Sequence, residues 1–238
     1  GVEISSNKIY GYATNYSDGG LKVSDFSSLA IKDNLFHAVS EDGEHSAGIF
    51  GRAEFRNVGD VEISNNRSIS DSGRAFGSAI GSGFTSDMNA NMHFILDGAG
   101  DVTVRGNSAT GKDAALGGAI YSSWGISISN CKNVEICDNF TRSTVIADLS
   151  KQEVRDAFGD DNYFAWDTKG AGAYGGALFV TLAAPVYGIH MSLLNNQSFV
   201  SRSNYVTDGT RYILQGIALV PGSGWSGESS AGLFGGSN

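Results

Sequence analysis

The sequence predicts an all-β protein with the fold of a right-handed parallel β-helix, and three observations support this class. The chain of 238 residues contains 33 Gly and 2 Pro, which disfavours long helices because each interior Gly costs about 1 kcal/mol relative to Ala. A first element, two aliphatic residues two positions apart and an Asn three positions further on, recurs and ends at Asn7, Asn34, Asn66, Asn107, Asn139 and Asn196. A second element, Gly-Gly-Ala-aliphatic or a close variant, alternates with the first and ends at Ile49, Ile80, Ile120 and Leu178.

The first element has the two-residue period of a β-strand, but each copy is too short to bury its own apolar face, so equivalent strands are expected to stack. Stacking would place the first aliphatic residues in one interior column: Val2, Leu29, Val61, Val102, Val134 and Met191. The second aliphatic residues would form the next column: Ile4, Ile31, Ile63, Val104, Ile136 and Leu193. We expect levels about 4.8 Å apart, a right-handed crossover and three short strands in each of about seven turns. The alternative, a β-sandwich, would not need the same residue type at the same place in every repeat.

The repeated Asn and the Gly-rich element are expected to form the bends. Asn tolerates the left-handed conformation and its amide bonds to nearby backbone groups, and stacked Asn side chains can form a ladder. The small residues of the Gly-rich element fit a tight corner or let a neighbouring level approach closely. In residues 117–139, the segments GGAIYSS, ISIS and VEIC would be the three strands of one turn.

The chain is predicted to be a single domain, residues 1–238, in which long gaps between repeats mark inserted loops at about 82–92, 140–170 and 199–212. Within the second loop, Ser150 and Glu153 form a capping box and Gly159 is a stop signal, which predicts a short helix near residues 151–158. The Gly- and Ser-rich residues 221–238 could cap the stack or result from truncation.

Charge and composition restrict the classes of partner. The net charge is −9, so a polyanion such as nucleic acid would be repelled. No apolar run reaches the roughly 18 residues of a transmembrane helix, and no cluster of Cys and His has zinc spacing. Cys131 and Cys137 could form a small disulfide or stay reduced, and both interpretations remain open.

The alternation of the two elements resembles the GGA[ILV] and [FIVL]-x-x-N repeats of polymorphic outer membrane proteins and related autotransporter passengers. The matching segments span nearly the whole chain: GSAI 77–80, GGAI 117–120, GGAL 175–178, ISSN 4–7, IKDN 31–34, ISNN 63–66, VRGN 104–107, ICDN 136–139 and LLNN 193–196. The family usually has Phe where this chain has Ile, Val or Leu. The resemblance implies a parallel β-helix from a secreted or surface-exposed bacterial protein associated with the outer membrane, with adhesion as the usual role.

The loop at residues 140–170 carries the candidate binding residues. Its segment DDNYFAWDTKG surrounds Tyr163 and Trp166 with Asp160, Asp161 and Asp167. Aromatic rings beside carboxylates suit a sugar site, in which the acids bind hydroxyls or perform acid–base catalysis. The same oxygens could bind Ca²⁺, although no cofactor is expected. The alternative is a loop that packs its aromatics locally and leaves its acids in solvent.

Acidic residues also lie on predicted strand exteriors, where some β-helix hydrolases and lyases place their catalytic groups. These residues are Glu62, Asp97, Asp101 and Glu135. They do not form a continuous acidic row, so we interpret them as a solvated face.

We therefore expect a non-enzymatic surface or secreted module, an adhesin or scaffold that binds a host glycan or protein through loops inserted between turns. Such a module would be a monomer or part of a larger surface protein. The alternative is a secreted hydrolase or lyase that acts on a host glycan or mucin-type glycoprotein, with Asp160, Asp161 or Asp167 as its acid–base groups.

Overall fold

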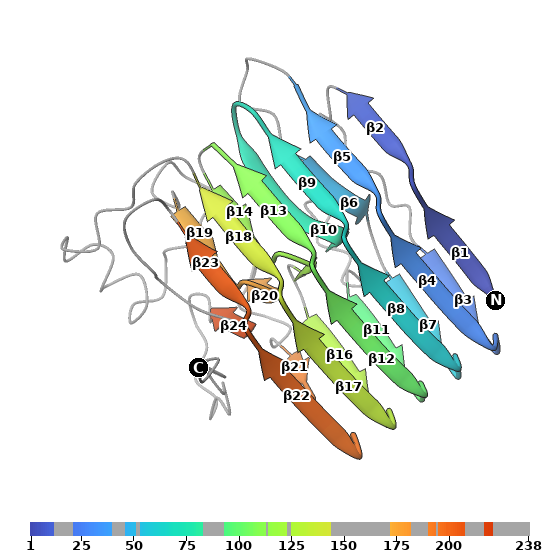
Figure 1. The fold of residues 1–238 in the computed structure, drawn as a ribbon. Coiled ribbons are helices and arrows are strands. Elements are labelled where there is room, and N and C mark those ends of the chain that lie inside the picture. Colours follow the sequence, from blue (N-terminus) through green and yellow to red (C-terminus); the bar gives the residue numbers. More distant parts are fainter. Residues whose placement is uncertain are drawn as a thin grey trace.

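The described residues form short strands joined by turns, and the strands make four parallel sheets (Figure 1). The structure is a computed structural model that describes residues 1–11, 21–39, 46–50, 53–82, 93–112, 114–122, 125–143, 172–181, 190–193, 195–207 and 217–220. Sheet A contains β1 Val2–Ser5, β4 Ser28–Lys32, β8 Asp60–Ser64, β12 Asp101–Arg105, β17 Asn133–Cys137 and β22 Ser198–Arg202. Sheet B contains β2 Lys8–Gly11, β5 Leu35–Ala38, β9 Arg67–Ser70, β13 Ser108–Gly111, β18 Phe140–Ser143 and β23 Tyr205–Thr207.

The other two sheets lie behind sheets A and B (Figure 1). Sheet C contains β3 Leu21–Ser24, β7 Ala53–Arg56, β11 His93–Asp97, β16 Gly125–Ser129 and β21 His190–Ser192. Sheet D contains β6 Ser46–Phe50, β10 Arg74–Ser82, β14 Ala114–Leu116, β15 Ile120–Ser122, β19 Gly172–Tyr174, β20 Leu178–Thr181 and β24 Ile217–Val220.

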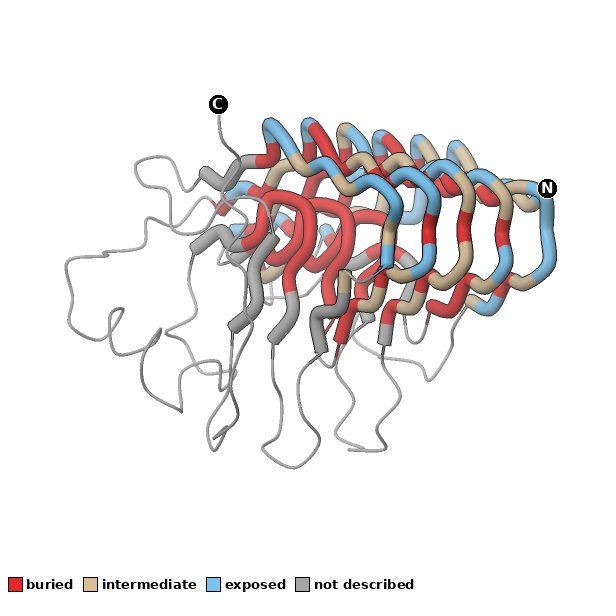
Figure 2. The backbone as a smooth tube through the Cα atoms, turned by 90° about the horizontal axis from the view of Figure 1, so that it is seen from below, coloured by how far each residue is buried: buried red, intermediate tan, exposed pale blue. Residues whose placement is uncertain are grey.

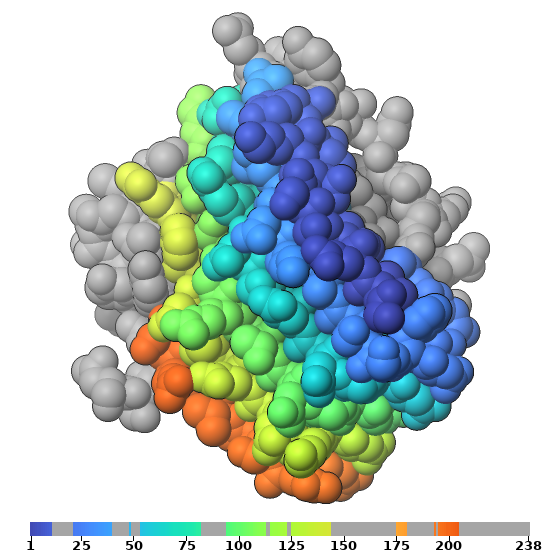
Figure 3. All heavy atoms as spheres, turned by 45° about the vertical axis from the view of Figure 1, so that its right-hand side comes forward, coloured from blue at the N-terminus to red at the C-terminus, as the bar shows by residue number. Residues whose placement is uncertain are grey.

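Along the chain, successive strands belong to sheets C, A, B and D in turn. The next strand of sheet C then pairs with the preceding strand of that sheet. For example, β7, β8, β9 and β10 follow one another, and β11 then pairs in parallel with β7. Figure 3 shows successive circuits as adjoining bands whose colours run from blue to orange. This all-β arrangement of stacked parallel strands is compatible with the predicted parallel β-helix.

From β3 onward, each circuit contains strands from four sheets, so the prediction of three strands per turn is wrong. The strand that follows each repeated Asn, in sheet B, was not recognised. Its inward positions hold small or polar residues such as Ser68, Ala109 and Thr141, all fully buried. Because these residues replace aliphatic ones, the sequence lacks the hydrophobic alternation that marks the other strands.

The predicted interior columns form as expected over the first five levels. Ile4, Ile31, Ile63, Val104 and Ile136 pair in register through sheet A. The other column runs through Val2, Leu29, Val61, Val102 and Val134. Figure 2 shows that buried segments predominate within the stack, whereas the N-terminal level is largely exposed or intermediate.

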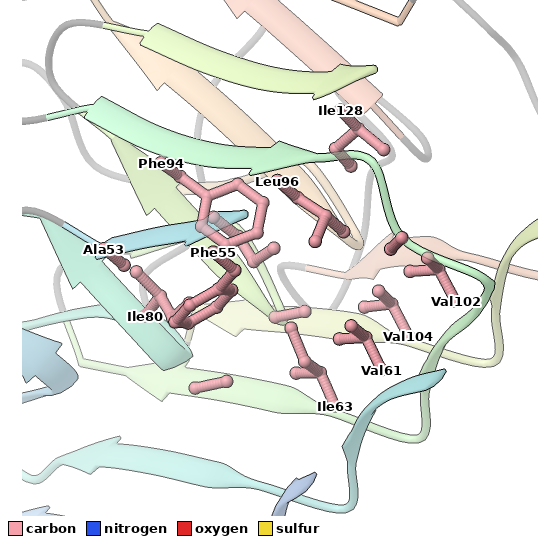
Figure 4. Close-up of a cluster of buried hydrophobic side chains, with 14 of the residues drawn as sticks. Ala53, Phe55, Val61, Ile63, Ile80, Phe94, Leu96, Val102, Val104 and Ile128 are labelled. Atoms are coloured by element: carbon pink, nitrogen blue, oxygen red, sulfur yellow. The ribbon is translucent and has the colours of Figure 1, made fainter. Parts of the chain in front are cut away.

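Sheet C completes this core with aromatic side chains. Phe55 and Phe94 are fully buried, and their rings meet edge to face with centroids 5.8 Å apart. In Figure 4 they lie in one cluster with Leu96 and with the sheet A residues Val61 and Val102. Aromatic pairs in this geometry stabilise a core beyond the area that they bury.

The sixth copy of the first element lies elsewhere. Met191 pairs with Ile126 in sheet C, so Met191, Leu193 and Asn196 do not continue the sheet A columns. The sixth level of sheet A is β22, where Phe199 pairs with Val134 and Ser201 with Ile136. The repeat pattern does not identify β22, because Ser201 stands where the other copies have an aliphatic residue.

The repeated Asn residues form a hydrogen-bonded ladder. The Nδ2 group of each donates to the Oδ1 atom of the Asn on the next level, over 2.8–2.9 Å, through Asn7, Asn34, Asn66, Asn107, Asn139 and Asn204. Asn204 therefore takes the place predicted for Asn196, which instead accepts from the backbone N–H of Cys131 and donates to the carbonyl of Ile128. The left-handed residue is the one before each ladder Asn, as at Asp33 (φ 56°) and Asp138 (φ 56°).

The Gly-rich element allows close approach between levels, as predicted. Its aliphatic residues Ile49, Ile80, Ile120 and Leu178 pair in register in sheet D. A Cβ atom on Gly118 would lie 2.0 Å from the carbonyl oxygen of Gly176 and 2.6 Å from that of Phe140. No side chain fits there, because real Cβ atoms do not approach backbone oxygens so closely.

Three loop predictions need correction or lie outside the described residues. Residues 140–143 form β18, and residues 199–202 and 205–207 belong to β22 and β23, so the first part of two predicted loops is strand. The rest of the predicted loop at 82–92 after Ser82, which ends β10, lies outside the described residues. So do residues 144–171 between β18 and β19, the predicted helix at 151–158 and the cap at 221–238.

The two cysteines are free and buried. Cys131 lies in the turn before β17 and Cys137 ends that strand, which alone spans about 13 Å, whereas a disulfide needs Cα atoms within about 7 Å. The structure thus selects the reduced interpretation. Burial raises the pKa of Cys131, and it raises that of Cys137 to about 11, so both thiols are protonated and unreactive at neutral pH.

Candidate functional site on the outer face of sheet B

The predicted loop site cannot be placed. Asp160, Asp161, Tyr163, Trp166 and Asp167 all lie outside the described residues. Their segment leaves the described structure at the end of β18 and re-enters it at β19. It is therefore attached to the end of a sheet B strand, and its role as a binding site stays a prediction.

The acidic residues predicted on strand exteriors are engaged with neighbouring side chains. Glu62 accepts a hydrogen bond of 2.7 Å from Ser64, and Asp101 accepts one of 2.7 Å from Asn133. Glu135 is paired with Arg202. These contacts satisfy the carboxylates locally, as expected for a solvated structural face.

Asp97 is the most constrained of these acids. It accepts hydrogen bonds from Asn130 (2.6 Å) and Ser129 (3.0 Å), and it pairs with Arg56 (3.1 Å). The bond from Asn130 contributes most to holding the pKa of Asp97 below its ordinary value, against the opposing effect of burial. A general acid needs a raised pKa, so this geometry does not suit Asp97 to acid catalysis.

Sheet B presents a different surface. Side chains alternate along its strands, so that Ser68 and Ser70 of β9 are buried while Arg67 is exposed and Ile69 is partly exposed. Register pairing extends this alternation across five levels. We call the outward residues the sheet B face: Lys8, Tyr10, Leu35, His37, Arg67, Ile69, Ser108, Thr110, Phe140 and Arg142.

The sheet B face contains cations and no carboxylate. Lys8, Arg67 and Arg142 are exposed, and none of them has an ion-pair partner among the described residues. The strands of sheets A and C differ, because their cations are paired. There, Glu3 pairs with Lys32, Glu54 with Lys22 and Arg56, Asp138 with Arg105, and Glu135 with Arg202.

An aromatic ring and an imidazole lie beside these cations. The Tyr10 residue is 59% exposed, and its ring centroid is 5.8 Å from that of His37. The Nε2 atom of His37 lies 2.9 Å from Oδ2 of Asp71, which follows β9 at the edge of the face. His37 is thus held between a neighbour on the first level and another on the third. An exposed ring beside fixed polar groups can stack on a sugar and hydrogen-bond its hydroxyls.

The sequence contains one weak signal for the sheet B face, which is the position of two cations relative to the repeated Asn. Lys8 and Arg67 each follow a ladder Asn directly, and alignment of the repeats on that Asn would have placed both in one outward column. The signal was weak because the equivalent positions hold Leu35, Ser108 and Phe140. Arg142 lies two residues later and belongs to the neighbouring column.

The described part of the chain has neither a metal-binding cluster nor a membrane-spanning helix. No group of three or more His, Cys, Asp or Glu side chains in it is arranged to hold a metal ion. None of its elements is a helix with the length and apolarity needed to span a bilayer. Comparisons with protein-family models, with curated proteins and with solved structures gave no match to this chain.

Proposed function

We propose that this chain is a module of a secreted or surface-exposed bacterial protein, a right-handed parallel β-helix that binds a host glycan or protein. The observation that carries the proposal is the sheet B face, where exposed cations lie beside Tyr10 and His37 and have no ion-pair partner within the described segments. Cations that are not paired within a protein remain available to a ligand. The resemblance to autotransporter passenger repeats supports the bacterial surface location.

The scaffold supports this role through its stiffness. The Asn ladder crosses all six levels of sheet A, and the fully buried core packs Phe55, Phe94 and Ile80 between the sheets. Groups held on a stacked sheet lose little conformational entropy on binding. The segment with Tyr163 and Trp166 follows β18 in the sequence and lies outside the described residues.

Binding to arrays of glycans and host proteins tests the proposal. Two double variants separate the two surfaces: Tyr10→Ala with His37→Ala for the sheet B face, and Tyr163→Ala with Trp166→Ala for the loop. Thr103→Ala on the outer face of sheet A is the matched control. We expect at least one double variant to lose binding with an unchanged circular dichroism spectrum, while the control retains it. An unmodified chain that binds nothing on either array would contradict the proposal.

The same experiment addresses the enzymatic alternative. Glycans recovered after incubation with the chain are analysed for cleavage over a wide pH range. Intact glycans are expected for a binding module. Products that disappear in an Asp160→Asn, Asp161→Asn or Asp167→Asn variant would instead favour the hydrolase or lyase.

A further inference from the structure

We propose that the sheet B face binds an extended anionic polysaccharide, one whose carboxylate or sulfate groups contact Lys8, Arg67 and Arg142. This inference rests on the proposed binding function and names the chemical class of its ligand. The three cations come from β2, β9 and β18, the first, third and fifth levels of sheet B. They therefore recur at every second level along the stack.

The spacing of these cations fits a polymer. Levels in a sheet are about 4.8 Å apart, so alternate levels place the cations at intervals of about 10 Å along the stack. Lys8 and Arg67 share one column, and Arg142 lies in the adjacent one. A small ligand would reach one cation, whereas an extended chain that runs across the strands would reach all three.

The side chains between the cations suit sugar rings. Tyr10 offers an exposed ring for stacking, and it lies beside the partly exposed His37, whose Nε2 atom contacts Asp71. Thr110 supplies a partly exposed hydroxyl group on the fourth level, where Ser108 is buried. Guanidinium groups bind carboxylate, and in the same way sulfate, through two parallel hydrogen bonds.

Charge separates this ligand from a nucleic acid. The net charge of −9 repels every polyanion at long range, and it repels one of high charge density most strongly. Duplex DNA carries about one charge per 1.7 Å of axis, far denser than one cation per about 10 Å. A polysaccharide with sparse anionic groups matches the row better. Asp71, which follows β9 at the edge of the face, already contacts His37.

Calorimetric titration with defined probes tests the inference. The probes are an oligosaccharide with one sulfate per disaccharide, an oligosaccharide with one carboxylate per disaccharide, neutral dextran, and single-stranded DNA. We expect binding to at least one anionic sugar and none to dextran or DNA. Arg67→Glu and Arg142→Glu should each weaken binding about tenfold, because each removes a charge-assisted contact and adds a repulsive charge.

Lys132→Glu is the matched control. Lys132 is an exposed cation in the turn between β16 and β17, away from the sheet B face, so its reversal should change affinity by less than about twofold. All substituted residues are exposed, and thermal unfolding checks that the variants fold. Dextran bound as tightly as the anionic sugars, equal effects of Arg67→Glu and Lys132→Glu, or preferential binding of DNA would each overturn the inference. Array binding to neutral glycans or proteins that survives these variants would leave the proposed function standing while this inference fails.

Discussion

Sheets A and B adjoin each other in the molecule, but their outer faces differ in whether the charged side chains are paired. On sheet A, Glu62 accepts from Ser64, Glu3 pairs with Lys32, and Glu135 pairs with Arg202. On the sheet B face, Lys8, Arg67 and Arg142 have no such partner among the described residues. The two faces share the same scaffold, so the difference lies in which side chains the sequence places outward. A face whose charged side chains are paired with one another has few charges available to a ligand, whereas a face with unpaired cations attracts anions.

The largest expected effect comes from breaking the Asn ladder that separates the two faces. Asn107 is fully buried, accepts from the backbone N–H and Nδ2 of Asn66, and donates to Asn139 and Ile63. Asn107→Ala leaves several buried groups without partners, at about 1–3 kcal/mol each. We expect the free energy of unfolding to fall by about 3–5 kcal/mol, measured by chemical denaturation.

The exposed amide Asn133, which donates to Asp101, is the control for the ladder. Asn133→Ala should cost less than about 1 kcal/mol. Similar losses for the two variants would show that burial of the ladder contributes nothing to its strength.

The second prediction converts the sheet B face to the pattern of its neighbours. Ile69 lies on the same side of β9 as Arg67, two residues after it; in sheet C, Glu54 lies two residues before Arg56, and there Nε and Oε1 are 2.6 Å apart. Ile69→Glu should supply Arg67 with an internal partner. Affinity for the anionic probe should fall about tenfold, with little change in stability because exposed pairs contribute about 0–1 kcal/mol.

Ile69→Gln separates charge from shape in this experiment. It has nearly the same size as Glu and no charge, so binding should be retained within about threefold. If both variants lose binding equally, the loss comes from the shape of the face and not from neutralisation of Arg67.

The third prediction concerns the inner side of sheet B. Thr141 Oγ1 is buried and makes no hydrogen bond within the described structure, between the column neighbours Ala109 and Val206. Thr141→Val keeps the shape and removes the unsatisfied hydroxyl, so the free energy of unfolding should rise by about 1 kcal/mol. Thermal or urea unfolding measures this, and a destabilised variant would show that the hydroxyl has a partner.

The smallest expected effect is a difference in pH dependence. The folded pKa of Asp97 is lowered, chiefly by Asn130, so its contribution to stability is present above its unfolded pKa and is lost as the pH falls through the folded value. In urea unfolding from pH 7 to pH 2, Asp97→Asn should lose less stability than the unmodified chain. Identical pH profiles of stability for the two proteins would contradict the role of Asp97.

Binding of a sulfated probe by the sheet B face should persist to about pH 4, because the face contains no carboxylate.

Sequence reasoning succeeded where one residue type repeats at a buried position. Five levels of the Ile4 column and of the Asn ladder, and the close approach at Gly118, followed from spacing and side-chain size. It failed at the last level, where Ser201 and Asn204 replace the expected pattern. It also missed sheet B, because interior Ser, Thr and Ala do not alternate in hydrophobicity with their neighbours.

The candidate loop site and the sheet B face differ in the same respect. Tyr163 and Trp166 can be recognised from the sequence because they lie close together, among acidic residues, in one short segment. Lys8, Arg67 and Arg142 are far apart in the chain, and nothing local distinguishes them from any other solvated cation.

By itself, then, the amino-acid sequence determined the stacking of short strands, since apolar side chains that cannot be buried within one strand must be buried against equivalent ones. Only the tertiary structure decided which cations are neutralised and which form a row. The physical reason is that pairing depends on neighbours from levels that lie 27 to 65 residues away along the chain. A change of one level in register would therefore give each charge different neighbours.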